Sequence, residues 1–361
     1  MHPAFGWAIT PRENVRCQMQ ISAESSQKIK NMSLICAFLV VVIHISWPAE
    51  QALSLGWFMQ EFMEEGIARI AVPFFFVVSG FFLAQHFEEQ DWWRRETTKR
   101  IKSLVVPFVL WSAITLIAPM PLSIIADLIA HRPFGTNICI AHNPLGFWGL
   151  DLTEFPGHVP LWYVRCLSLF VLTGWLFKWG VGRFKYWWLG LAFAFSLVQN
   201  HLPTENWREF FRMGYSAGGI VYFSLGVFIQ KFKPQIEGRK VALWCGIAGL
   251  GLLVLKLFFA YKGYRGEIAL GKFAVPCLLY LVWSITPTSE WPKWLTACSF
   301  PIFLIHIVLL AYFGIAFKHV PVPEIWAAFI SLAGSFGGAI AITLLLRRYL
   351  PKFAGILFGG R

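Results

Sequence analysis

Long apolar runs, separated by short polar or charged interruptions, set the pattern of this chain. Such runs reach the roughly 20 residues that an α-helix needs to cross the hydrocarbon core of a bilayer. They are too long for the strands of an outer-membrane barrel, which alternate over about 10 residues. The pattern predicts ten helices, near residues 31–47, 66–86, 103–121, 161–178, 186–199, 214–230, 241–261, 268–286, 298–317 and 325–346. The predicted fold is all-α, a polytopic integral membrane protein with about ten transmembrane helices.

Composition supports a membrane protein and excludes a soluble domain. Of the 361 residues, 57% are hydrophobic and only 14% are charged, whereas soluble domains carry about a quarter charged residues. We expect one transmembrane domain over residues 31–346, with tails at 1–30 and 347–361. The first tail lacks the apolar core of a cleavable signal peptide.

The positive charge of the chain is explained by topology. Lys and Arg outnumber Asp and Glu by 31 to 19, for a net charge of +12. If the helices alternate from a cytoplasmic N-terminus, 21 of the 31 basic residues lie on the cytoplasmic side and 7 on the other. The positive-inside rule therefore predicts that both termini are cytoplasmic. Nucleic acid is not an expected partner. The longest external connection, 122–160, contains three histidines and is a candidate cap over a site: His131, His142 and His158.

Ionisable residues inside apolar helices are the first candidates for function, because burying them in a membrane costs several kcal/mol. His44 ends the run "SLICAFLVVVIH", about 14 residues beyond Lys30, which places it roughly 20 Å along the helix. Its neutral imidazole can accept a proton as a general base. His306 in "SFPIFLIHIVLL" lies halfway along another helix. A structural hydrogen bond is the competing interpretation for each histidine.

Further candidates lie near the outer ends of helices. Arg165 in "PLWYVRCL" and Arg69 in "EEGIARIAV" can snorkel to the surface or turn inward. Glu65 precedes Arg69 by four residues, so the two can pair on one helical face. We expect Lys256 to snorkel. Ser79 stands beside a glycine in "VVSGFF", where a neighbouring helix or a slim substrate can approach closely.

A basic cluster, "RRETTKRIK" at 94–102, stands at the predicted cytoplasmic end of the third helix. Lys99, Arg100 and Lys102 suit either anionic lipid headgroups or the phosphates of a cytosolic ligand. No spacing of Cys and His typical of a metal site is present in the sequence. We therefore expect no bound metal.

Taken together, the segments resemble the membrane acyltransferase 3 family, ten-helix enzymes that modify cell-envelope glycans, lipids and antibiotics in bacteria. The resemblance rests on five segments in the expected order: the first-helix run that ends in His44, "PFFFVVSGFFL" at 73–83, "KRIKSLVVPFVLW" at 99–111, "LWYVR" at 161–165 and "SFPIFLIH" at 299–306.

The chain departs from the family pattern at two positions. The family usually has an arginine eleven residues before the first-helix histidine, and here that residue is Ser33. Lys30, three residues earlier on the same helical face, is the candidate replacement. Relatives often have an acidic residue directly after "WYVR", and here it is Cys166.

The resemblance implies an acyltransferase of the bacterial inner membrane that uses acyl-CoA, usually acetyl-CoA, from the cytoplasm. The acceptor would be a hydroxyl or amine of a glycan, glycolipid or small molecule, with membrane lipids around the protein. The expected roles are catalysis for His44 and Arg165, donor binding for the basic cluster with Lys30, and substrate binding for Arg69, Ser79, His306 and Glu65.

Two other classes remain open from the sequence. A transporter or flippase would also place His and Arg inside a helical bundle, although we find no inverted repeat. A glycosyltransferase acting on lipid-linked sugars would use external carboxylates such as Glu50, Glu61, Glu64 and Glu65. Labelled acetyl-CoA or a sugar-nucleotide requirement would discriminate among the three.

Overall fold

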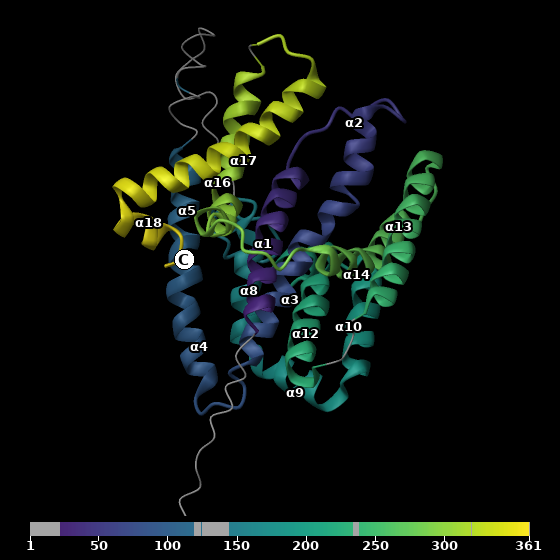
Figure 1. The fold of residues 1–361 in the computed structure, drawn as a ribbon, viewed down its shortest axis with the longest axis vertical. Helices are drawn as coiled ribbons and strands as arrows, with labels where there is room; N and C mark the ends of the chain where they lie inside the picture. The colour runs from purple at the N-terminus through teal and green to yellow at the C-terminus, as the bar shows by residue number, and fades with distance from the viewer. Residues whose placement is uncertain (1–21, 119–123, 125–143, 234–237, 319, 361) are drawn as a thin grey trace, which may run out of the picture.

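The computed structural model describes residues 22–118, 124, 144–233, 238–318 and 320–360, and over these ranges the chain forms helices without a strand. The all-α prediction is confirmed. The elements are α1 (Ala23–Ile43), α2 (Leu55–Phe58), η1 (Met59–Glu64), η2 (Ile67–Ile70), α3 (Ala71–Ala84), α4 (Trp92–Arg100), η3 (Ile101–Val105), α5 (Val106–Ile117), α7 (Pro144–Phe147), α8 (Leu161–Leu172), α9 (Gly174–Phe184), α10 (Tyr186–Val198), η4 (Gln199–His201), α11 (Glu205–Glu209), η5 (Phe210–Gly214), α12 (Ala217–Phe232), α13 (Arg239–Lys262), α14 (Glu267–Ile285), α15 (Lys293–Thr296), α16 (Ser299–Ala316), α17 (Glu324–Tyr349) and α18 (Pro351–Leu357) (Figure 1).

Each of the ten predicted apolar segments contains a helix. Within the described residues, seven helices are long and apolar enough to cross a membrane, and the bent pair α8–α9 makes an eighth candidate. The other two, α10 with 13 residues and α12 with 16, are shorter than a full crossing. The polytopic membrane character is confirmed, while ten crossings and cytoplasmic termini stay predictions.

Three differences from the predicted segments bear on the site. Helix α1 starts at Ala23, where the side chain of Ser22 accepts a hydrogen bond from the backbone N–H of Ser25 at 3.1 Å. The predicted helix 161–178 bends by 68° between α8 and α9, where the hydroxyl of Thr173 donates to the carbonyl of Leu169. The basic run 94–102 is helical, since α4, η3 and α5 form one continuous segment over 92–117.

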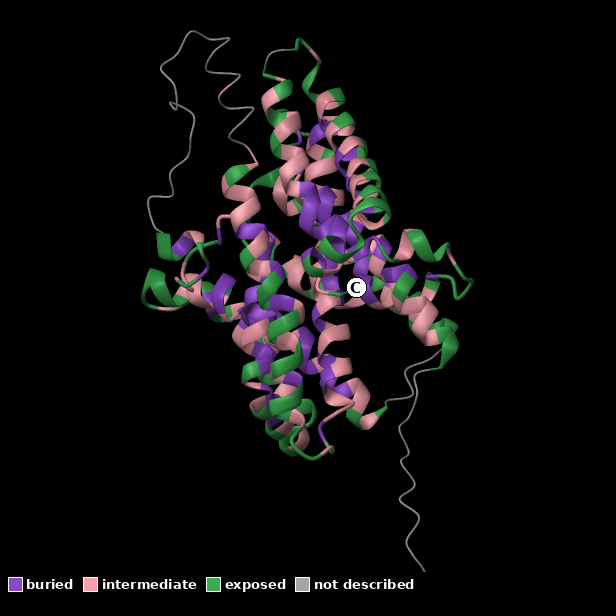
Figure 2. Cartoon of the chain, turned by 90° about the vertical axis from the view of Figure 1, so that its left-hand side faces the viewer, coloured by how far each residue is buried: buried purple, intermediate pink, exposed green. Residues whose placement is uncertain are grey.

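Close backbone contact joins α3 and α12 at the centre of the bundle. A Cβ added to Gly80 would lie 2.1 Å from the carbonyl oxygen of Phe223, and one added to Gly226 would lie 2.0 Å from that of Val77. Only glycine permits this approach. The two helices run side by side (Figure 1), and the buried residues concentrate along the middle of the molecule (Figure 2).

The C-terminal segment packs back onto the third apolar segment. Trp111 of α5 donates its indole N–H to the carbonyl of Leu357 at 3.2 Å. Gly359, at φ +65°, lies so close to Ser103 that a Cβ there would be 2.3 Å from its carbonyl oxygen. Much of the predicted tail 347–361 therefore belongs to the helical packing. Residues 1–21 and the loop histidines His131 and His142 lie outside the described residues.

Candidate active site

Three histidines from distant parts of the chain come together. His44 caps the C-terminal end of α1 and His306 lies in α16, with ring centroids 5.0 Å apart. His158, in the segment that precedes α8, interacts electrostatically with both. Its ring packs on Trp111 at 5.6 Å. The sequence singled out the first two for chemistry and noted His158 only as part of a possible cap.

Local hydrogen bonds fix the tautomers of His44 and His306. Nδ1 of His44 lies 2.8 Å from the carbonyl oxygen of Val40, and Nδ1 of His306 lies 3.0 Å from that of Ile302. A carbonyl only accepts, so each neutral ring carries its proton on Nδ1 and has its lone pair on Nε2. Nε2 of His306 is buried without a hydrogen-bond partner among the described residues. His44 is only half-buried, so its Nε2 is the more accessible base.

A pair of hydroxyls belongs to the same region of the bundle. Ser79 Oγ of α3 lies 3.2 Å from the hydroxyl of Tyr163 in α8. The Tyr163 ring packs on Phe303 at 5.7 Å, and Phe303 lies 6.5 Å from the ring of His306. The aromatic contacts thus connect the hydroxyl pair to the histidines. Sequence reasoning did not single out Tyr163, although its position in "LWYVR" could have indicated it.

Arg165 is committed to the backbone. Its guanidinium donates four hydrogen bonds, all to carbonyl oxygens: those of Gly149 at 3.3 Å, Asp151 at 2.7 Å, Glu154 at 2.8 Å and Met213 at 3.2 Å. Both terminal nitrogens are therefore occupied, which points to a positioning role. The side chain ties the segment that leads to His158 onto η5.

Two ion pairs lie in the segment that follows α1. Glu65 and Arg69 pair at the expected four-residue spacing, and their side chains are 38% and 41% exposed. The charge of Arg69 also acts on His44. The expectation that Lys256 snorkels is wrong, because its side chain is 6% exposed and its ammonium lies 2.9 Å from a carboxylate oxygen of Glu61. Because Glu61 neutralises its charge inside the protein, the ammonium of Lys256 does not need to reach the membrane surface.

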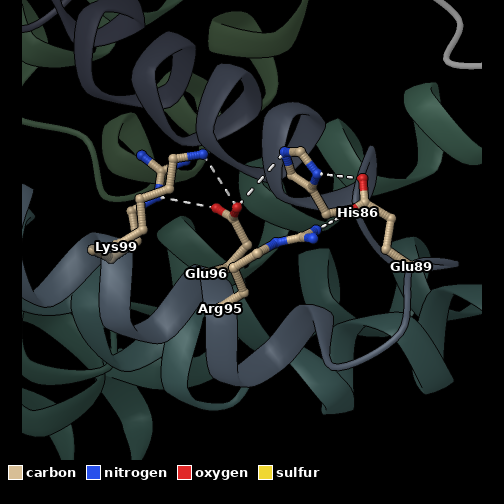
Figure 3. A network of polar contacts seen from close by, with 6 residues as sticks. His86, Glu89, Arg95, Glu96 and Lys99 are labelled. Atoms are coloured by element: carbon tan, nitrogen blue, oxygen red, sulfur yellow. Dashed lines mark hydrogen bonds and ion pairs between the residues drawn. The ribbon is translucent and has the colours of Figure 1, made fainter.

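The basic cluster surrounds a buried carboxylate (Figure 3). Glu96, 1% exposed, lies 3.3 Å from Lys99, 3.7 Å from Arg100 and 3.7 Å from His86. A second carboxylate, Glu89, pairs with Arg95 and with His86. Burial lowers the pKa of His86 even beside Glu96. The sequence did not identify these carboxylates as partners, although Glu96 stands inside the basic run.

Lys102 and Lys30 are the least constrained of the candidate donor-binding residues. Lys102, the last residue of the cluster, is an exposed side chain of η3, and Lys30 is exposed on α1. The Ser33 hydroxyl donates to the carbonyl of Ile29 at 2.7 Å, so it is satisfied by its own helix. The structure thus separates the candidates into a group around the histidines and a basic cluster, with Lys30 in neither.

The described residues contain no group of three or more His, Cys, Asp or Glu side chains able to hold a metal ion. The available chemistry is that of a neutral imidazole base, with a pair of hydroxyls connected to it through the Phe303 ring. This combination suits proton removal from a hydroxyl or amine and stabilisation of a developing oxyanion.

Comparison with known proteins identifies the family of the chain. The profile of a known family, described as an acyltransferase domain, matches residues 29–344. The chain is 25% identical over 368 residues to the succinoglycan biosynthesis protein ExoH of Rhizobium meliloti (strain 1021), with 94% of each protein covered. No solved structure matches. Because the family profile covers most of the chain, including every candidate residue named above, the protein belongs to the membrane acyltransferase 3 family.

Proposed function

We propose that this membrane acyltransferase moves an acetyl group from acetyl-CoA to a hydroxyl of a cell-envelope glycan at the bacterial inner membrane. The observation that carries the proposal is the pair His44–His306, whose Nδ1 protons are fixed and whose Nε2 lone pairs have no hydrogen-bond partner within the part of the chain that the structure describes. The relative in Rhizobium is named for the biosynthesis of succinoglycan, which supports a glycan as acceptor.

His44 acts as general base in this proposal. The acceptor oxygen attacks the thioester carbonyl carbon while its proton moves to Nε2 of His44, and the carbonyl electron pair becomes an oxyanion. Collapse of the oxyanion re-forms the carbonyl and breaks the carbon–sulfur bond. The sulfur leaves with the proton from the imidazolium, so the products are the ester and free CoA, and His44 returns to its neutral form.

The surrounding residues assist without forming bonds to the acyl group. Ser79 and Tyr163 supply hydroxyl hydrogens that can stabilise the oxyanion. His306 packs against His44 and limits its rotation. Arg165 acts indirectly, by holding the segment that carries His158 against the site.

The donor enters from the cytoplasm. Lys99, Arg100 and Lys102 hold its phosphates, and buried Glu96 orients the first two of these cations. Half of the hydrocarbon core is about 15 Å thick, which an extended pantetheine arm can span. A thioester near the middle of the membrane is therefore compatible with phosphates at the inner surface.

Transfer of label tests the proposal. Membranes that contain the protein are supplied with acetyl-CoA labelled in the acetyl group and with the de-esterified exopolysaccharide of the host. We expect base-labile label in the polysaccharide, and none with membranes that lack the protein. Solute movement without labelling, or a requirement for a sugar nucleotide, would overturn it in favour of a transporter or a glycosyltransferase.

A further inference from the structure

A pocket of about 730 Å³ lies away from the histidines, between η1, the α10–η4 end and the turn that joins α13 to α14. The positive-inside pattern places that turn on the outer side of the membrane, where α1 ends at His44. The volume falls within the roughly 300–1,000 Å³ typical of small-molecule sites. Its wall includes Trp57, Glu61, His201, Tyr264, Arg265 and Glu267. We refer to it as the outer pocket.

Glu61, one of the lining residues, is held by an ion pair with Lys256, which stands behind the wall. The two residues are 195 positions apart, and their side chains are only 15% and 6% exposed. Burying such a pair costs more than a packed apolar contact would, so it marks a candidate functional site. Lys256 bonds to Oε2 of Glu61, and Oε1 has no hydrogen-bond partner among the described residues. Lys256 therefore holds the Glu61 carboxylate in place, and Oε1 of Glu61 is a charged acceptor at the wall of the pocket.

The rest of the wall combines aromatic surface with polar groups of both charges. Trp57 and Tyr264 supply the aromatic faces, and the ring of Tyr264 is held by Phe259 at a centroid distance of 5.5 Å. Arg265 and Glu267 add a donor and an acceptor. Lys272, the other lysine at the wall, already donates to the carbonyl of Ser196.

This balance of charges selects among ligands. A phosphate or lipid headgroup is bound by an excess of cations, but here two carboxylates face two cations. A sugar has hydroxyls that donate and accept and a C–H face that packs on an aromatic ring. Aromatic side chains beside paired donors and acceptors match that combination.

One segment connects the outer pocket with the histidines. Glu61, Glu65 and Arg69 follow one another along η1 and η2, and the charge of Arg69 acts on His44. We propose that the outer pocket is a saccharide-binding subsite that holds the acceptor glycan while a hydroxyl further along it reaches His44. This inference rests on the proposed function. A contact made equally in the ground and transition states lowers the KM for the acceptor.

Three single variants test the subsite in the purified full-length protein in lipid nanodiscs. Trp57→Ala and Tyr264→Ala remove the aromatic faces. Tyr261→Ala is the matched control, because Tyr261 is a similarly exposed tyrosine of α13 that does not line the pocket. The probe is the host exopolysaccharide, de-esterified and cut to oligosaccharides. Label transfer from acetyl-CoA gives kcat and KM, and saturation-transfer NMR reports binding of the oligosaccharide without turnover.

We expect Trp57→Ala and Tyr264→Ala to raise the KM for the oligosaccharide roughly 10-fold, with kcat and the KM for acetyl-CoA nearly unchanged, since the contact is equal in ground and transition states. Their saturation-transfer signals should weaken, while those of Tyr261→Ala stay at the wild-type level. Unchanged KM and NMR signals in both pocket variants would overturn the subsite and leave the acyltransferase proposal standing. Oligosaccharide binding that depends on Trp57 and Tyr264, without any transfer in the wild type, would support the subsite and overturn the proposed function.

Discussion

His44 and His306 owe their protonation pattern to their own helices. Each donates Nδ1–H to the carbonyl four residues earlier. In a catalytic triad, a buried carboxylate accepts this hydrogen bond and fixes the tautomer. A carbonyl holds the tautomer without adding a negative charge next to the ring. The base therefore depends on a well-placed acceptor, and the nearby residues act mainly by positioning groups around it.

Arg165 illustrates such positioning, and its geometry makes a prediction. Lysine keeps the charge but cannot donate to four separate carbonyl oxygens with the fixed fork of a guanidinium. We expect Arg165→Lys to lower kcat about 10-fold or more and to speed proteolysis of the segment 149–158, with the KM for acetyl-CoA unchanged. Wild-type kcat and protection in Arg165→Lys would show that charge alone is needed there.

His158 makes stability depend on pH. Burial, with a smaller contribution from the charge of His44, lowers the pKa of His158 to about 4, whereas an unfolded histidine titrates near 6.5. Below about pH 6.5 the unfolded chain binds a proton that the folded chain refuses. Stability contributed by neutral His158 is thus complete above about pH 6.5 and is lost as the pH falls toward 4.

Thermal unfolding in detergent checks this dependence. Between pH 7 and pH 4.5 the Tm of the wild type should fall more steeply than that of His158→Gln, which cannot titrate. At pH 7.5 and above, the difference between the two proteins should be constant. Parallel curves over the whole range would contradict a buried neutral His158.

At the scale of elements, the sequence predicted the apolar segments well because each helix must present a long apolar surface to lipid. Features that depend on a partner far along the chain were not predictable. Glu61 pairs with Lys256 across 195 positions, and Arg165 bonds to carbonyl groups that carry no side-chain signature. Thr173 gives no strong breaking signal, so the bend between α8 and α9 was also missed.

The α3–α12 contact supplies a prediction with an internal control. Gly80→Ala would place its Cβ only 2.1 Å from the carbonyl oxygen of Phe223. A Cβ on Gly251 of α13, in contrast, meets nothing within 4 Å. Overpacking of this kind costs about 1–3 kcal/mol or more. We expect Gly80→Ala to lower the Tm by several degrees and Gly251→Ala to leave it unchanged or raise it slightly. Equal Tm values for the two variants would contradict this packing.

At the scale of the whole molecule, the basic cluster and the histidines occupy separate places. The basic cluster occupies one end of the segment 92–117, and the histidines gather where α1, α16 and the segment before α8 meet. Trp111 joins the C-terminal segment to this site, since it packs on His158 and donates to the carbonyl of Leu357. The proposed function requires the cluster to face the cytoplasm and His44 to face outward.

Reporter fusions test that orientation. Green fluorescent protein fused after the C-terminus should fluoresce, because both termini are predicted to be cytoplasmic. Alkaline phosphatase inserted in the turn 263–266 should be active, because that turn is predicted to be external. The reverse pattern at both positions would invert the topology and remove the cytoplasmic donor site.

In the proposed mechanism, His44 is the general base for acyl transfer. The most direct measurement is kcat for transfer of labelled acetyl from acetyl-CoA by His44→Ala, in protein whose Tm and acetyl-CoA binding match the wild type. A general base contributes about 10²-fold or more, and we expect kcat to fall at least that far, with the remaining rate free of the wild-type pH dependence. A kcat near that of the wild type in the folded variant would contradict the mechanism.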